Sequence, residues 1–205
     1  IKLERATGIS AEFWNSLQGN YDIACSRIMA EKRNEQEIEL AKKYNYNELA
    51  SFKLVPAVPD WIERVKNLLA LFRVDSLLYV PQIEKIAFRQ SMGKINDYSL
   101  FAWLRFGEIE AEKLKVEKFD ETKFKQSVAE MKKLTFLPKD FYKTLQNICA
   151  DCGVLVVYTP YFKNTKVNGA VRWLGDNPLI QLNSRGTYSD TFWFTFFHEI
   201  GHILL

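Results

Sequence analysis

Two histidines and a glutamate near the end of the sequence have the types and spacing of a metal-dependent hydrolase. They are His198, Glu199 and His202, in the order H-E-x-x-H. Histidines four residues apart lie on one face of a helix, so both imidazoles can reach one metal ion at Zn–N distances of about 2.0–2.1 Å. The glutamate beside the first ligand can take a proton from a water on the metal without binding the metal itself. The spacing therefore supports hydrolysis of a peptide bond.

The motif does not arise from a histidine-rich background, because the 205 residues contain only these two histidines. Apart from the motif and two threonines, the stretch from Thr191 to Leu205 is apolar on every side, which predicts a helix buried on all faces. Burying a His-Glu-His set there is costly unless a metal partners it. The alternative is that hydrogen bonds satisfy both histidines in a helix that only resembles a metallopeptidase helix.

The motif supplies two metal ligands, whereas catalytic zinc sites usually have three protein ligands and leave a fourth position for water. In enzymes with this motif the third ligand usually follows it, but only three residues follow His202 in this sequence. We therefore expect zinc to be the cofactor, and we expect this chain to hold it weakly or not at all.

Strands are predicted immediately before the motif helix, where apolar and β-branched runs are separated by turn residues. The helix itself is predicted to be capped by Ser189 or Asp190. This order predicts a small sheet packed on the metal-bearing helix, with an edge strand that can pair with an extended peptide substrate. The predicted strands are residues 153–159, 169–174 and 179–183, with a turn at 175–178.

The rest of the sequence predicts helices, giving an α+β fold with a mostly helical N-terminal half and a small three-stranded sheet packed on the H-E-x-x-H helix. Ser10 and Asp60 are expected to cap two of these helices. The predicted helices are residues 3–6, 11–17, 23–51 with a break near Asn45 and Asn47, 61–72, 82–91, 98–113, 120–133 and 141–151.

Composition limits the class of protein. A hydrophobic content of 47% is ample for a packed core, and the net charge of +3 is spread along the chain, so charge alone gives no case for nucleic acid. No apolar run is long enough to span a membrane, and no signal peptide is recognisable. Three cysteines fit a reducing compartment. We expect a cytoplasmic protein with no membrane partner and, because the sequence lacks an initiator methionine, a piece of a longer chain.

Two further groups of residues were weighed as functional sites. Cys149 and Cys152 form a C-x-x-C pair that could ligate zinc or shuttle electrons, but a single pair at a helix end is more typical of small packing residues. Arg89 and Arg105 could bind an acidic partner. Because they lie beside aromatic core positions, we favour ion pairs between helices.

The end of the sequence resembles the core of the ImmA/IrrE metallopeptidase family, and other segments resemble proteins that fuse an XRE-type domain to that peptidase. Thr7 to Gln18 with Tyr21 and Asp22 resembles the closing helices of XRE-type, HigA-like helix-turn-helix domains, although an ordinary amphipathic helix pair is the alternative. The peptidase resemblance is carried by Trp173, Leu174, Pro178 to Leu182, Arg185, Asp190 and Phe192 to Leu205, and the connector resemblance by residues 87–89, 103–105, 107 and 108.

This resemblance implies three parts. Residues 1–24 would be the remnant of an XRE-type domain, residues 25–118 a helical connector, and residues 119–205 a peptidase domain that is incomplete at its C-terminus. It implies a bacterial or prophage regulator whose peptidase cleaves a repressor-type protein partner. His198 and His202 would be the metal ligands and Glu199 the general base, while DNA would be contacted only through a more N-terminal part. The alternative is a non-catalytic sensor or dimerisation module of a DNA-binding regulator.

Overall fold

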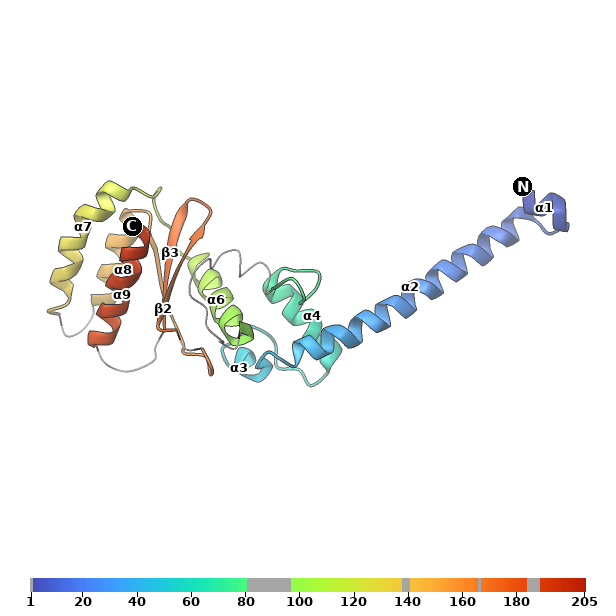
Figure 1. Ribbon diagram of the computed structural model, residues 1–205, viewed down its shortest axis with the longest axis horizontal. Helices are drawn as coiled ribbons and strands as arrows, with labels where there is room; N and C mark the ends of the chain where they lie inside the picture. The colour runs from blue at the N-terminus through green and yellow to red at the C-terminus, as the bar shows by residue number, and fades with distance from the viewer. Residues whose placement is uncertain (1, 81–96, 138–140, 166, 184–188) are drawn as a thin grey trace.

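The computed structural model describes residues 2–80, 97–137, 141–165, 167–183 and 189–205. The fold is α+β, as predicted: helices dominate the first part of the chain and a three-stranded sheet packs on the motif helix (Figure 1). The helices are α1 (Lys2–Thr7), α2 (Ala11–Ala41), α3 (Tyr46–Ser51), α4 (Trp61–Phe72), α6 (Asp97–Ala111), α7 (Glu121–Leu134), α8 (Phe141–Asp151) and α9 (Ser189–Leu204). The strands are β1 (Leu155–Thr159), β2 (Gly169–Leu174) and β3 (Asn177–Asn183).

The sheet has the order β1-β3-β2, so β3 is central. It runs parallel to β1 and antiparallel to β2, with which it forms the predicted hairpin. Gly175 adopts a φ of +60° in the connecting turn, a conformation that glycine enters without steric penalty. Every β3 residue from Pro178 to Asn183 is buried, including the polar Gln181 and Asn183, as expected of a central strand with both faces covered.

Helices cover both faces of the sheet (Figure 1). On one face, Ile180 and Leu182 of β3 share a core with Phe196 and Ile200 of α9, to which α8 also contributes Leu145. On the opposite face, α6 packs on β1 and β3, where Ala111 and Leu179 meet. The sheet with α6, α8 and α9 forms one layered body. The predicted peptidase domain begins at residue 119, but α6, which precedes that boundary, packs on the sheet as part of this body. The domain division itself stays a prediction.

The predicted N-terminal caps explain where several helices begin. Ser10 Oγ accepts a hydrogen bond from the backbone N–H of Phe13, and Asp60 Oδ2 accepts one from Glu63. Satisfying an otherwise unpaired N–H in this way stabilises a helix by about 1 kcal/mol. Both predicted caps are confirmed.

The prediction of separate helices at residues 11–17 and 23–51 is wrong. A single helix, α2, runs from Ala11 to Ala41 and α3 follows it; Gly19 does not break it, because an isolated glycine inside a helix is tolerated at a cost of about 1 kcal/mol. The predicted boundary at residue 24 therefore falls inside a continuous helix. The predicted helix at 82–91, with Arg89, lies outside the described residues.

The predicted cap of the motif helix is also wrong. Ser189 and Asp190 both lie within α9 rather than before it, and Asp190 Oδ1 accepts a hydrogen bond from the backbone N–H of Thr191 at 2.7 Å. Among the described residues, every helix is too short or too polar to cross a lipid bilayer.

Candidate metal and catalytic site

Helix α9 is held by one face and exposes another. Trp193, Phe196 and Ile200 are buried in the core, whereas His198 and His202 are exposed and Phe194 is 77% exposed. The expectation of a helix buried on all faces is therefore wrong. The residues at positions 194, 198 and 202 are four apart, so they form one stripe that points away from the sheet.

The two histidines converge on one point. Their Nε2 atoms lie 3.2 Å apart, and their rings meet edge to face with centroids 4.7 Å apart. Two nitrogen ligands about 2.05 Å from one zinc ion at the tetrahedral angle would lie about 3.3 Å apart, so the observed separation fits a shared metal ion. Phe194 lies nearly parallel to the His198 ring, with centroids 6.3 Å apart. The histidine pair predicted from the sequence is therefore brought together.

The described residues do not complete a three-ligand site. Within the described ranges, no group of three or more His, Cys, Asp or Glu side chains is arranged to hold a metal. Two acidic residues of α9 are not placed to act as the third ligand. Glu199 is buried against β2, and Asp190 lies two turns earlier on the helix. In the described part of the chain, two convergent nitrogen donors are therefore available to a metal.

Glu199 is adjacent to His198 but points to a different side of the helix. It is only 7% exposed and lies between Thr195 and the start of β2 at Gly169. Burial raises the pKa of this carboxyl to about 7, because the charged form loses contact with water. The glutamate predicted as general base is therefore close to the histidines but partly desolvated.

An open pocket of about 710 Å³ lies beside His198 and Glu199. Its other lining residues are Val167, Asn168 and Gly169 from the sheet side and Asp190, Thr191, Phe194 and Thr195 from α9. The pocket therefore joins the candidate catalytic groups to the beginning of β2, the strand at one edge of the sheet.

The cysteines behave as the packing residues that the sequence favoured. Cys149 and Cys152 are free thiols, 0% and 1% exposed, within the core under α9. Burial raises the pKa of Cys149 well above the ordinary value, and the neighbouring Cys152 adds to the effect. Such a thiol is inert at neutral pH, because the thiolate is the reactive form.

Arg105 has structural partners, but the expected ion pair between helices is not what the structure shows: its ion pair with Glu108 lies within α6, and its contact with another helix is a hydrogen bond to a backbone carbonyl. Its Nε donates to the carbonyl of Leu71 in α4 at 2.7 Å, and its Nη1 pairs with Glu108 at 2.5 Å. Arg172 of β2 pairs with the other oxygen of Glu108 at 2.9 Å. This cluster joins α4, α6 and β2.

Sequence reasoning missed Gly169, Thr195 and Phe194 as parts of the site. A glycine at the start of a strand can mark a close approach of another chain segment, so Gly169 did carry a signal. Phe194 also carried a signal, because it lies four residues before His198 and therefore on the same face of the helix. Arg185 lies outside the described residues.

Comparisons with family models, curated proteins and solved structures gave no match to this chain. The geometry of the site and the motif that forms it are therefore the basis for assigning a function.

Proposed function

We propose that this chain carries a zinc-dependent endopeptidase site. The observation that supports it best is the convergence of the His198 and His202 Nε2 atoms at 3.2 Å, beside a buried glutamate and an open pocket. The same 3.2 Å separation is also a hydrogen-bond distance between the two rings, so the alternative of a histidine pair satisfied without metal is decided by measuring zinc binding. The composition of the pair and its spacing suit zinc, which takes nitrogen ligands in tetrahedral geometry.

Each residue of the site has a distinct role in this proposal. His198 and His202 would hold the ion, which when bound supplies Lewis-acid polarisation of the scissile carbonyl and acidifies a water. Glu199 would accept the proton of the attacking water and return it to the leaving amine. Its position against Gly169 keeps the carboxylate at the wall of the pocket.

The edge strand gives the proposal its substrate class. An edge strand presents unpaired backbone N–H and C=O groups, and an extended peptide can add to it as another strand. Because β2 begins at Gly169, a peptide paired along β2 would pass the pocket that contains Glu199 and His198. An extended segment of a protein therefore suits this site better than a compact small molecule does.

The biological setting that we propose is a bacterial or prophage transcriptional regulator, in which the peptidase cleaves a repressor-type protein partner. The support is the resemblance of residues 119–205 to ImmA/IrrE metallopeptidases and of the N-terminal segment to XRE-type domains. Cleavage of a repressor is peptide-bond hydrolysis, and it requires an extended, accessible segment in the repressor that can pair with the edge strand.

Metal binding and cleavage test the proposal together. We would titrate zinc into wild type, Glu199→Gln, His198→Ala and His202→Ala by calorimetry, and follow cleavage of denatured casein at saturating zinc by mass spectrometry. We expect weak zinc binding, as two ligands imply, in wild type and in Glu199→Gln, no binding in either histidine variant, and cleavage by wild type alone. Loss of zinc in Glu199→Gln would contradict its assignment as a non-ligand.

A non-catalytic sensor or dimerisation module is the second candidate, and one observation favours it: the described residues contain no three-ligand group. Zinc that stays bound without any cleavage would support a sensor. Wild type that binds no zinc when titrated with the ion would overturn the peptidase proposal, because the two histidines would then have no shared ligand.

A further inference from the structure

Another pocket, of about 200 Å³, lies at the opposite edge of the sheet from the histidines. It borders Val154 and Val156, just before and within β1, whereas the pocket beside Glu199 lies at β2. In the described sheet these strands form the two edges, so the pockets are separate. We call this one the lysine pocket. Its other lining residues are Lys113, Leu114, Lys115, Val116, Lys143, Gln146, Asn147 and Ala150.

Helix α8 forms one wall of the lysine pocket. Lys143, Gln146, Asn147 and Ala150 are spaced by three and four residues, so they lie on one face of the helix. Gln146 Nε2 donates a hydrogen bond to the carbonyl of Val156 at 3.0 Å, and Lys143 Nζ donates to Gln146 Oε1 at 3.4 Å. The other face of α8 is buried in the core under α9. This wall is therefore fixed both by the core and by β1.

The segment 113–116, which follows α6, forms the other wall. Its apolar members Leu114 and Val116 pack against the core between α6 and the sheet, and its two lysines are exposed. The next residue, Glu117, donates its backbone N–H to the carbonyl of Ala150 at 3.1 Å, which ties the segment to the end of α8. Both walls are thus held in place by the fold itself, as is usual for pockets that bind small molecules.

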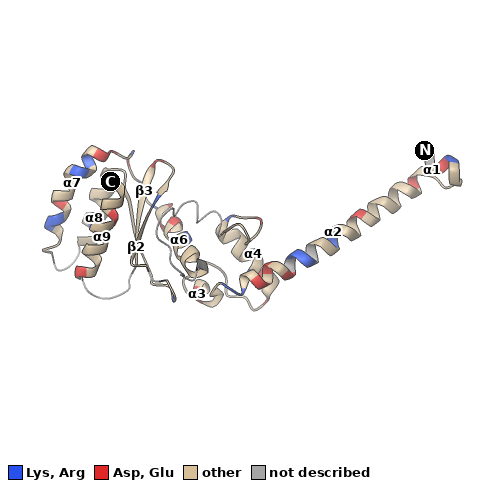
Figure 2. Ribbon diagram, viewed as in Figure 1, with Lys and Arg blue, Asp and Glu red and all other residues tan. Residues whose placement is uncertain are grey.

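The charge of the lysine pocket has one sign. Three of its ten lining residues are lysines, and none is Asp or Glu. Lys113 Nζ pairs with Glu110 at 2.6 Å, whereas Lys115 and Lys143 have no ion pair within the described ranges. Acidic and basic residues lie close together elsewhere, as along α7 in Figure 2. Two lysine charges are therefore available to an anion here.

The chemistry of the walls selects the class of anion. A phosphate monoester carries about −1.5 to −2 charges at pH 7, which matches two lysines without carboxylate partners. Lysine binds phosphate as a point charge through its ammonium donors. The side chains of Leu114, Val116 and Val154 offer an apolar surface to the rest of such a ligand. A volume of about 200 Å³ is below the roughly 300–1,000 Å³ of drug-sized sites, so the ligand has to be compact.

We propose that the lysine pocket binds a small phosphate monoester whose apolar part is about the size of one ring. The phosphate lies between Lys115 and Lys143, and the apolar part lies against Val154. The site shares no residue with the histidine site, and the proposal does not depend on the proposed peptidase function.

An amide NMR titration with phenyl phosphate tests the proposal on the metal-free protein in a buffer without phosphate. We expect saturable shifts at Gln146, Ala150 and Val156, with a dissociation constant in the millimolar range or tighter. Lys115→Gln with Lys143→Gln should weaken binding by about tenfold or more, because two charge-assisted hydrogen bonds are lost. Both lysines are exposed, so the fold should be retained. No saturable shift in wild type, or equal binding by the double variant, would overturn the proposal.

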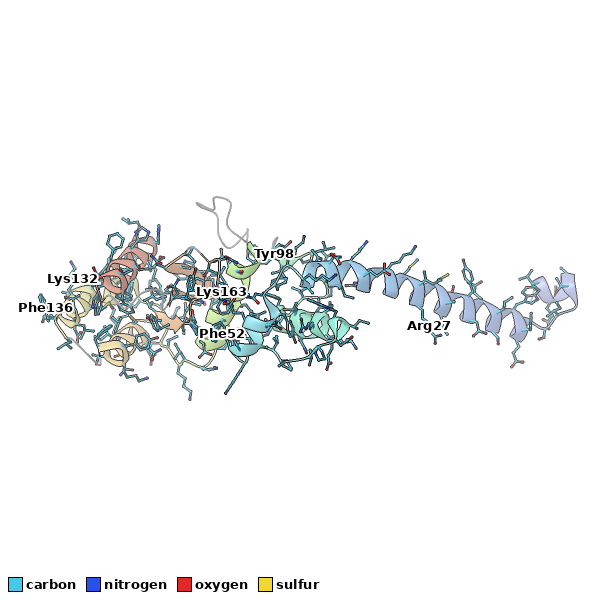
Figure 3. All side chains as sticks on the ribbon, turned by 90° about the horizontal axis from the view of Figure 1, so that it is seen from below. Arg27, Phe52, Tyr98, Lys132, Phe136 and Lys163 are labelled. Carbon is cyan, nitrogen blue, oxygen red and sulfur yellow. The ribbon has the colours of Figure 1, made fainter. Side chains whose placement is uncertain are left out.

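A matched control separates the pocket from net charge. Lys132→Gln with Lys133→Gln also removes two exposed lysines, from the last turn of α7 and outside the pocket. Figure 3 labels Lys132 near the end of the molecule that lies opposite the extended part of α2. This variant should bind phenyl phosphate as wild type does. Equal weakening in the two double variants would mean that overall charge attracts the ligand, and the pocket assignment would be wrong.

Related ligands and the histidine site complete the test. Benzoate keeps the ring with a single charge, and inorganic phosphate lacks the ring, so both should bind more weakly than phenyl phosphate. Benzoate that binds as tightly would contradict selection of a phosphate, and inorganic phosphate that binds as tightly would contradict the role of the apolar wall. His198→Ala with His202→Ala should bind phenyl phosphate unchanged. Loss of binding in that variant would place the ligand at the histidines instead.

Discussion

Gly169 and Glu199 are in direct contact across the interface between β2 and α9. A Cβ atom at position 169 would lie 2.9 Å from Glu199 Oε1 and 2.6 Å from Thr195 Cγ2. Both distances are shorter than ordinary van der Waals contacts between carbon and its neighbours. The absence of a side chain at Gly169 is therefore what allows the buried carboxylate to lie against the edge strand.

Gly169→Ala should displace Glu199 and loosen the docking of α9 on β2. Overpacking of this kind typically costs about 1–3 kcal/mol in the free energy of unfolding. We expect that loss in chemical denaturation, together with loss of any cleavage, while the exposed histidine pair still binds zinc. Gly201→Ala on the same helix is the control: its Cβ would meet nothing within 4 Å, and replacing a helical glycine should stabilise by about 0.5–1 kcal/mol.

Stability of the metal-free protein should fall as pH rises, because burial raises the pKa of Glu199 from 4.5 to about 7. The folded state holds this proton more tightly than the unfolded state. Its contribution is therefore greatest below pH 4.5 and is lost between pH 4.5 and 7. At 1.36 kcal/mol per pKa unit, the loss is about 3 kcal/mol.

Glu199→Gln should remove this pH dependence, because an amide does not titrate. Unfolding measured with a chelator present should show the variant gaining up to about 3 kcal/mol relative to wild type across that pH range, with no relative change below it. Parallel pH profiles for the two proteins would show that the carboxyl is not desolvated in the folded chain.

Thiol labelling should distinguish the three cysteines. Cys25 on α2 is partly exposed, whereas Cys149 and Cys152 are buried and the pKa of Cys149 is raised. Native protein should therefore react rapidly with a maleimide at one thiol and at three after denaturation. The Cys25→Ser variant should show no rapid labelling when folded; rapid reaction would mean that the C-x-x-C pair is accessible.

The fold was largely readable from the sequence because its signals are local. The strand at 169–174 and the helix at 141–151 match the structure at both ends, since turn residues and a change of periodicity mark them. The length of α2 was not readable, because its apolar and charged stretches look different although the backbone continues. A change in side-chain pattern reports what surrounds a helix and says little about where the helix ends.

The candidate site was predicted in part for the same reason. His198, Glu199 and His202 belong to one helical turn, so their spacing fixes their relative placement. The contact of Glu199 with Gly169 depends on how α9 docks on β2, which involves residues thirty positions apart. Phe194 shares the four-residue spacing of His198 and His202, so the sequence places it on their face, whereas the exposure of that face depends on the same docking.

The Glu108 carboxylate should be one of the most stabilising polar groups in the layered body. It pairs with Arg172 at 2.9 Å and with Arg105 at 2.5 Å, and the two arginine side chains are only 4% and 9% exposed. Removing one partner from a buried pair costs about 3–5 kcal/mol, because the remaining charge stays desolvated. We expect Glu108→Ala to show a loss of this size in urea denaturation.

Two comparisons separate burial from charge in this result. Glu110→Ala removes an ion pair with Lys113, which lies in the turn after α6, but the Lys113 side chain is 62% exposed, so the cost should be about 0–1 kcal/mol. Arg172→Met should cost less than Glu108→Ala, because Glu108 keeps Arg105 as a partner, whereas Glu108→Ala removes an ion pair from both arginines. Equal losses for Glu108→Ala and Glu110→Ala would show that water screens the cluster and that it does not hold β2 against α6.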